Sequence, residues 1–444
     1  MNIFRERRDR LASLVSTPVI LWSGTASPRN FPANRFPFRA SSHFLYFAGL
    51  PLENAAIRLE EGKLELFINE PHTGAALWHG ESPSLAQLAE TIGADAAYPL
   101  EKLSVKSAKA ATIALQDYRT YQQQCQILDR NLPQEIDLTL ARAIVALRLA
   151  HDAGALAELG KAAKVAVQAH LAGMGAVGRA KTESQVRGAM EGVIIAQNMT
   201  CAYNSIVTVH GEVLHNEQYH NPLQGGDLLL ADVGAETPLG WASDITRTFP
   251  VTGRFSPPQR DVYEVVLAAH DACIEAIRPG VEYRDIHLLA ARILAGGLVN
   301  LGILRGNTED LVARDAHALF FPHGVGHLLG LDVHDMEDLG DLAGYGEGRT
   351  RSDRFGLCYL RLDRSLQPGM LVTIEPGFYQ VPAILSNPQF REKYQDAVNW
   401  DFLPKFSDVR GIRIEDDVLV TNSGKEVLTA QLPTKISEIE QLIS

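Results

Sequence analysis

The chain has 444 residues, of which 46% are hydrophobic and 21% charged, and its formal net charge is −12. This length favours two domains over one, and the composition is that of a folded protein rather than a disordered one. The acidic balance argues against a general nucleic-acid binder, and no apolar run approaches the roughly 20 residues that a membrane span requires.

The N-terminal segment MNIFRERRDRLASLV is basic, but a Ser-Thr-Pro sequence interrupts the apolar stretch and no small-residue cleavage site follows. A secretory signal is therefore not expected. The cysteines are far apart, with no C-x-x-C pair: Cys125, Cys201, Cys273 and Cys358. This usage excludes a zinc ribbon and predicts a cytoplasmic protein with reduced thiols.

The first part of the chain mixes short runs typical of β-strands with Pro, Gly and Asn: VILWSG, HFLYFAGL and KLELFIN. We expect a small α/β domain there. Residues 135–174 are rich in Ala and Leu at helical spacing, with Gly154 and Gly160 interrupting the pattern. They predict a linker helix and then the first helix of a second domain, which divides the chain into residues 1–150 and 151–444.

The second domain alternates helical and strand-like segments. Its sequence predicts helices at residues 183–198, 258–277 and 284–301. A Pro-Pro pair opens the second of these helices, at a position where proline is tolerated. Strands are predicted at residues 227–234, 241–249, 370–375 and 411–420.

The stretch LLLADVGAETPLGWASDITRTFP contains two apolar strands around a turn with Pro238 and Gly240. A hairpin centred on Pro238 pairs position 232 with position 244, which would place Asp232 and Asp244 on one face with Cβ atoms about 5 Å apart. Two such carboxylates repel each other unless a positive group lies between them. This stretch alone is equally consistent with exposed or capping aspartates, although Asp is depleted in strands.

Two glutamates and three histidines extend the pattern. Glu375 in LVTIEPGFY and Glu415 in GIRIEDDVLV each end an apolar run, and either one alone would be an ordinary solvated residue. The segment FFPHGVGHLLGLDVHD carries His323, His327 and His334, and its glycines predict a loop rather than a helix. It lacks the HExxH motif, which excludes that class of zinc peptidase.

Charge counting favours a metal site. The four carboxylates and one neutral imidazole carry −4, which two divalent cations would neutralise. Without metal, the uncompensated charges would cost several kcal/mol each. An oxygen-rich set with one histidine suits Mn²⁺, Fe²⁺ or Co²⁺ better than a closed tetrahedral zinc site.

The motifs DITRTFP, HGVGHLLGLDVHD, TIEPGFY and GIRIEDD together resemble the pita-bread metallopeptidases, within them the proline-specific prolidases and aminopeptidases P. FPFRASSHFLYFAGL resembles the N-terminal domain of aminopeptidase P. The resemblance implies an α+β fold, with a C-terminal pita-bread catalytic domain and a smaller N-terminal α/β domain. The metal ligands that it implies are Asp232, Asp244, His327, Glu375 and Glu415.

The resemblance also implies hydrolysis by a two-metal-activated water. Mn²⁺ is the expected ion, with Co²⁺, Fe²⁺ and Zn²⁺ as alternatives, and the partners are a short proline-containing peptide and a second copy of the chain, without nucleic acid or membrane. Glu375 would be the general base, His215 or His334 would polarise the scissile carbonyl, and His323 would position the substrate. Ordinary buried histidines are the alternative for His323 and His334. The implied catalytic residues are Glu375, His215, His323 and His334, and the implied substrate-binding residues are Arg361, Arg413 and Tyr379.

Substrate length divides the two activities of this branch. Arg361, in YLRLDRSLQPGMLVTIEPG, resembles a prolidase arginine that binds the dipeptide carboxylate, although a solvated loop arginine is the alternative. The insertion ILSNPQFREKYQDAVNWDFLPKFSDV also resembles prolidase, whereas the N-terminal domain resembles aminopeptidase P. We therefore predict an Xaa-Pro dipeptidase, with an Xaa-Pro aminopeptidase as the alternative and a metal-free peptide-binding relative as a distant one.

Overall fold

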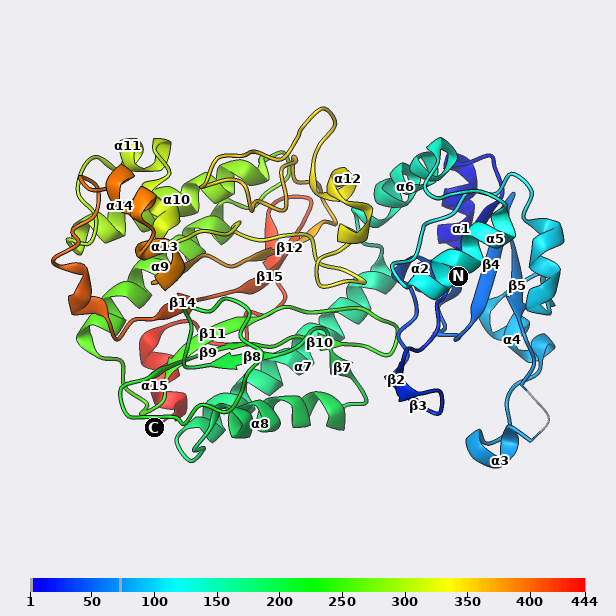
Figure 1. The fold of residues 1–444 in the computed structure, drawn as a ribbon, viewed down its shortest axis with the longest axis horizontal. Coiled ribbons are helices and arrows are strands. Elements are labelled where there is room, and N and C mark those ends of the chain that lie inside the picture. Colours follow the sequence, from blue (N-terminus) through cyan, green and yellow to red (C-terminus); the bar gives the residue numbers. More distant parts are fainter. Residues whose placement is uncertain (1–2, 72–73, 444) are drawn as a thin grey trace. The chain divides into compact units, whose positions relative to one another are not determined.

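The computed structural model describes residues 3–71 and 74–443. The chain folds as two compact units, residues 1–149 and 150–444 (Figure 1). The first unit contains a sheet in the order β1-β4-β5-β6, antiparallel except for the parallel pair β5 and β6. Its strands are β1 Val19–Trp22, β4 Ala55–Glu60, β5 Lys63–Ile68 and β6 Ala96–Tyr98, with a separate hairpin of β2 Pro28–Phe31 and β3 Asn34–Arg35. Its helices are α1 Ile3–Leu14, α2 Ser42–Ala48, α3 Ala76–His79, α4 Leu85–Ile92, α5 Tyr118–Leu128 and α6 Glu135–Arg148.

One prediction in this unit is wrong. The run HFLYFAGL, predicted to be β-rich, forms α2, which ends at Gly49 in the left-handed conformation. Every residue of α2 is buried, so the run is apolar on all sides and shows no periodicity that would separate a helix from a strand. The predictions for VILWSG and KLELFIN are confirmed by β1 and β5.

The second unit begins with a long helix, and among its described residues three further helices of more than ten residues confirm the predicted ones. α9 starts at a proline behind a capping box formed by Ser256 and Gln259. Neither Gly154 nor Gly160 interrupts α7 as predicted. The helical stretch is interrupted at residues 149–152 instead, and Asp152 caps α7 by accepting the Ala155 N–H. The helices are α7 Ala153–Val177, α8 Glu183–Ala196, α9 Pro257–Ala276, α10 Tyr283–Asn300, α11 Thr308–Ala313, α12 Asp341–Gly344, α13 Pro382–Leu385, α14 Pro388–Lys393 and α15 Ile436–Ile443.

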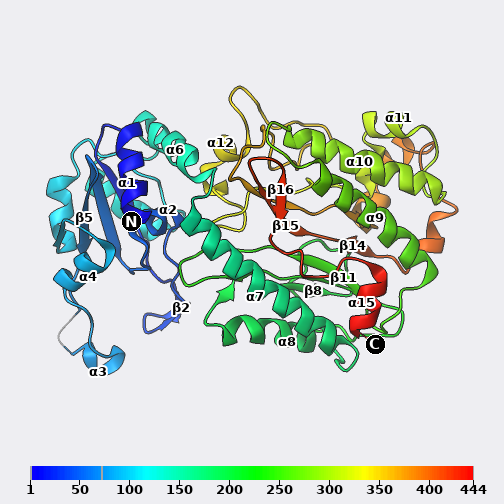
Figure 2. The ribbon, with the colours of Figure 1, turned by 180° about the vertical axis from the view of Figure 1, so that it is seen from behind.

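The strands of this unit form short antiparallel sheets in the orders β11-β9-β8, β12-β15-β16, β13-β14 and β10-β7. Both views show α7, α9 and α10 lying across one face of these strands (Figures 1 and 2). The four predicted strands are present with shorter bounds, and the last is split into two. The bounds are β7 Thr200–Cys201, β8 Ile206–Thr208, β9 Leu228–Asp232, β10 Ala235–Glu236, β11 Thr246–Pro250, β12 Leu371–Ile374, β13 Gly377–Tyr379, β14 Gly411–Arg413, β15 Asp416–Val420 and β16 Lys425–Val427.

Two further expectations concern the whole chain. All four cysteines are free thiols, as their spacing predicts. Within residues 3–71 and 74–443, none of the helices combines the length and the apolar character that crossing a bilayer requires.

Candidate metal centre

The two aspartates lie on the hairpin of β9 and β11, but its register differs from the prediction. Asp232 pairs with Thr246 rather than with Asp244, because the turn occupies residues 237–241, with Gly240 at φ +87°. The register has therefore moved by two residues. Since side chains alternate between the faces of a sheet, an even shift keeps Asp232 and Asp244 on the same face, now as diagonal neighbours.

The two glutamates are placed by a second pair of ladders. β12 pairs with β15 and β13 pairs with β14 in one common register. Glu375 and Glu415 lie in the gap between the two ladders, where this register puts them opposite each other. The Glu415 N–H donates to the Thr246 carbonyl oxygen at 3.0 Å, which joins these strands to the aspartate hairpin.

The histidine segment, residues 320–336, contains no helix or strand, which confirms the predicted loop. It lies along β12: the Thr373 N–H donates to the His327 carbonyl oxygen at 3.0 Å, and the Glu375 N–H to that of Val325 at 2.8 Å. Gly326 is required in this approach, because a Cβ at that position would lie 2.1 Å from the Thr373 carbonyl oxygen. The loop therefore holds His327 directly against the strand that ends at Glu375.

We expect Gly326→Ala to lower the free energy of unfolding by about 2 kcal/mol or more, because backbone rather than a flexible side chain blocks the new methyl group. Turnover should fall as well, since the loop that carries His327 must shift. Gly348→Ala is the matched control: Gly348 has φ +76° and nothing within 4 Å of an added Cβ, so it should cost only about 1 kcal/mol of backbone strain. Urea unfolding measures both, and equal losses would contradict the steric argument.

The ring of His327 is oriented as a ligand. Its Nδ1 lies 3.0 Å from the Leu328 carbonyl oxygen, which can only accept, so Nδ1 carries the hydrogen. The lone pair of Nε2 then faces Asp244 Oδ2 at 3.4 Å and Glu375 Oε1 at 3.6 Å. When both carboxylates are ionised, three acceptors converge with no hydrogen among them. A backbone partner at the far nitrogen is typical of a metal-bound histidine.

The burial of these acidic groups also favours a bound cation. Asp244, His327 and Glu415 are 6%, 4% and 1% exposed, and their ligand atoms lie within 4.8 Å of one another. Burial, together with the charge of Asp232, raises the pKa of Asp244 to about 8, and burial raises that of Glu375 to about 7. Burial and the neighbouring carboxylates also raise the pKa of Glu415 well above its usual value. Divalent cations would remove this penalty, so the donor set fits the metals that its chemistry predicts.

Arg413 links the acidic groups through hydrogen bonds. It is buried and donates to Asp232 Oδ2 at 2.5 Å, to the Tyr379 hydroxyl at 3.0 Å and to Thr246 Oγ1 at 3.0 Å. Thr246 in turn donates to Glu415 Oε2 at 2.7 Å. Arg413 lines the same cavity as the carboxylates, whereas Tyr379 is fully buried and its hydroxyl contacts Arg413 and His323. The predicted role of Tyr379 in substrate binding stays a prediction.

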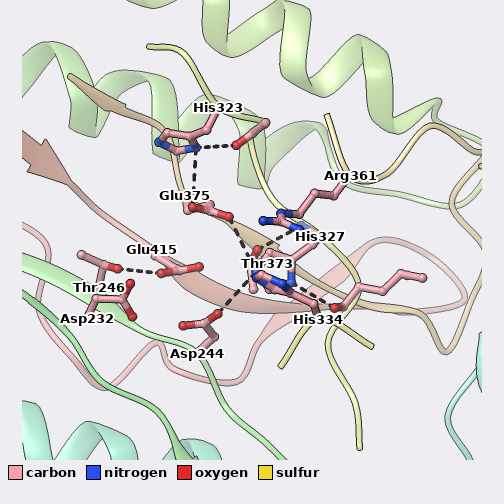
Figure 3. Close-up of polar contacts among 12 residues, drawn as sticks. Asp232, Asp244, Thr246, His323, His327, His334, Arg361, Thr373, Glu375 and Glu415 are labelled. Atoms are coloured by element: carbon pink, nitrogen blue, oxygen red, sulfur yellow. Dashed lines mark hydrogen bonds and ion pairs between the residues drawn. The ribbon is translucent and has the colours of Figure 1, made fainter. Parts of the chain in front are cut away.

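The remaining predicted residues surround the same cavity. Figure 3 shows His334 and Arg361 beside His327, on the side of the cluster away from Asp232 and Glu415. His323 has both nitrogens engaged, with Nδ1 2.8 Å from the Gly324 carbonyl oxygen and Nε2 2.9 Å from the Tyr379 hydroxyl. The cavity is lined by His215, Asp232, Asp244, His323, His327, His334, Arg361, Glu375, Arg413 and Glu415.

Three residues of the site were not predicted. The Tyr203 hydroxyl lies 2.5 Å from Asp232 Oδ1 and 2.5 Å from Asp244 Oδ1, although no sequence pattern singles it out. Glu337 pairs with both His334 and Arg361 from a segment without periodicity. Thr246 had a usable signal, because it follows Asp244 by two residues and so shares its face of the strand.

The sequence profile of Metallopeptidase family M24 matches residues 157–422, which is more than half of the chain. The chain belongs to metallopeptidase family M24. A second profile, for the aminopeptidase P N-terminal domain, matches residues 4–116. These matches confirm the predicted resemblance and the two-domain α+β architecture, and an M24 metallopeptidase uses divalent metal ions.

Relatives of this M24 chain extend over nearly its whole length. It is 30% identical to an Xaa-Pro aminopeptidase of Haemophilus influenzae, over 99% of this chain and 97% of that protein. Among solved structures, it is similar to aminopeptidase P from E. coli with the inhibitor Pro-Leu, at 28% identity and a TM-score of 0.80, over 99% of this chain and 97% of that one. Aminopeptidase PepP of Pseudomonas aeruginosa is similar at 29% identity and the same TM-score, over 99% and 97%. These relatives favour the predicted alternative, the aminopeptidase, over the dipeptidase.

Proposed function

We propose that this M24 member is an Xaa-Pro aminopeptidase, which removes the N-terminal residue from peptides whose second residue is proline. The observation that carries the proposal is the buried convergence of carboxylates on the His327 Nε2 lone pair. It occurs in a chain whose first domain matches the aminopeptidase P N-terminal profile and which is similar to aminopeptidase P over 99% of its length. The complete ligand set disfavours the metal-free binding relative. A homodimer and a cytoplasmic location stay predictions.

Two divalent ions, with Mn²⁺ as our proposal, would be held by Asp232, Asp244, His327, Glu375 and Glu415. Bound there, they would supply Lewis acidity to a water nucleophile and to the scissile carbonyl. The protein contributes the fixed positions of the oxygens, since each carboxylate is placed by a strand register or by Arg413, Tyr203 or Thr246. Such preorganisation keeps the charge in place as the reaction proceeds.

Glu375 is the proposed general base. It lies at the end of β12, with Oε1 towards His327 and Oε2 3.7 Å from His323 Nδ1. From this position it can take a proton from the attacking water and pass it to the proline nitrogen as the bond breaks. The Nδ1–H of His323 points towards both the Gly324 carbonyl oxygen and Glu375, so we assign His323 a positioning role rather than contact with the leaving nitrogen.

The tautomers separate the roles of the other two histidines. His334 Nδ1 lies 2.7 Å from a carboxylate oxygen of Glu337, so this nitrogen carries the hydrogen and Nε2 of the neutral ring is an acceptor. His334 Nε2 is therefore suited to accept a hydrogen bond from a substrate N–H. Burial and nearby Arg413 lower the pKa of His215, which keeps its ring neutral at pH 7. A neutral His215 still has one N–H, and we assign it to the scissile carbonyl.

A peptide panel tests the proposed function. With Mn²⁺ supplied, we expect Ala-Pro-Ala to be cleaved with a kcat/KM about tenfold or more above that of Ala-Pro, and Ala-Ala-Ala to resist cleavage. Chelated enzyme is the control, and repeating the panel with Co²⁺, Fe²⁺ and Zn²⁺ ranks the ions. Cleavage of Ala-Pro alone would restore the dipeptidase prediction. Cleavage of the proline-free peptide Ala-Ala-Ala would refute both the aminopeptidase proposal and the dipeptidase prediction.

A further inference from the structure

One carboxylate holds two donors of the cavity wall. Glu337, in the short 3₁₀ helix Glu337–Leu339, forms an ion pair with the Arg361 guanidinium through Oε1. Its other oxygen, Oε2, accepts from His334 Nδ1 at 2.7 Å. Both partners line the cavity of the metal centre. Glu337 therefore belongs to the site through its contacts, although it is not a predicted metal ligand.

We propose that Glu337 is a specificity-determining residue that occupies Arg361 and so disfavours substrates whose own carboxylate reaches this wall. Such substrates are dipeptides, in which the residue after the scissile bond carries the terminal carboxylate. The proposal rests on the proposed function and deepens it, because it gives a physical reason for a preference for longer peptides.

The argument is one of competition for a guanidinium. Arginine binds carboxylates in preference to neutral groups, and among the described residues Glu337 supplies the polar contact of the Arg361 side chain. A dipeptide carboxylate must displace Glu337 or lie beside it, where like charges repel. In a longer peptide a neutral amide takes the place of this carboxylate, and it neither competes strongly for Arg361 nor repels Glu337.

The expected effect is moderate, because the pair is partly solvated: the side chains of Arg361 and Glu337 are 37% and 41% exposed. Ion pairs at such exposure change equilibria by no more than about fivefold. This amount is still measurable as a ratio between two substrates that differ in one charge.

Glu337→Gln is the sharpest test, because glutamine keeps one oxygen to accept from His334 while its amide cannot accept from Arg361. We expect kcat/KM for Ala-Pro to rise about fivefold, mainly through KM, while Ala-Pro-amide and Ala-Pro-Ala change less than about twofold. Adding Arg361→Met should cancel the gain. The matched control is Asp341→Asn, which removes a charge from the adjoining pocket that His334 and Arg361 also line. Asp341 pairs with Arg351, so this substitution should leave the ratios unchanged.

Binding gives a readout that does not need turnover. Calorimetric titration of metal-loaded enzyme with proline and with prolinamide compares a carboxylate with an amide, and Glu337→Gln should tighten proline alone by about fivefold. A loss of Ala-Pro or proline affinity would overturn the proposal and show that Glu337 positions Arg361. Equal changes for all ligands would overturn it in favour of an effect through His334. If wild-type enzyme cleaves no Xaa-Pro peptide, the proposed function fails, while the proline-to-prolinamide ratio still decides the role of Glu337.

Discussion

Asp244→Ala is expected to abolish both metal binding and turnover, with a loss of about a thousandfold or more in kcat/KM. Asp244 Oδ2 faces the His327 lone pair and its Oδ1 faces the Tyr203 hydroxyl, so its removal opens the centre of the donor set. Metal content by plasma mass spectrometry and cleavage of Ala-Pro-Ala measure the two losses. Asp261→Ala, on the exposed side of α9, is the control and should keep both.

The stability of the chelated protein separates ligand loss from misfolding. Without metal, the burial that raises the pKa of Asp244 to about 8 is a cost of the fold. Chelated Asp244→Ala should therefore unfold at the same temperature as chelated wild type, or above it, whereas metal should stabilise wild type alone. A variant that still holds two ions and turns over would refute the two-metal scheme.

The residues predicted as metal ligands lie together in the structure because their placement depends on features that small errors in strand register or bounds do not change. Asp232 and Asp244 needed only to share a face, and alternation preserved that face although the register moved by two residues. Glu375 and Glu415 needed only to end paired apolar strands. The glycines of the histidine loop signalled irregular backbone, and Gly326 indeed lies where a Cβ would meet the Thr373 carbonyl oxygen.

The rest depended on contacts between distant segments. Tyr203 joins the two aspartates from 29 and 41 residues away, and no local period marks it. The partners of His323 and His334 set which ring nitrogen carries hydrogen, and they follow from the packed loop alone. Gly160 misled the helix prediction because one glycine costs only about 1 kcal/mol, which the apolar face of α7 offsets.

Arg247→Met is expected to lower the free energy of unfolding by about 3–5 kcal/mol at pH 7, because it leaves a buried carboxylate without its cation. Arg247 is fully buried on β11, and its Nη2 lies 2.9 Å from Asp416 Oδ1. It also donates to the carbonyl oxygens of Glu415 at 2.7 Å and Leu432 at 2.9 Å, which ties the ligand strand to the C-terminal segment. Arg254→Met is the control: its side chain is 74% exposed, so its pair with Glu440 should contribute less than about 1 kcal/mol.

The pH dependence of this loss identifies its cause. Burial opposes the charge of Asp416, but Arg247 and His270 outweigh it and lower the pKa to about 2. Because that value lies below the unfolded pKa of about 3.9, the pair stabilises the fold above pH 4, and the contribution is lost as pH falls towards 2. Without Arg247 the pKa of Asp416 in the folded variant rises. Asp416 of the folded variant therefore takes up a proton as the pH falls from 7 to 4, while Asp416 of the wild type stays ionised. The difference in free energy of unfolding between variant and wild type should narrow over this range. Urea unfolding of chelated protein at several pH values measures that gap; a constant gap would assign the loss to packing of the arginine stem instead of to its charge.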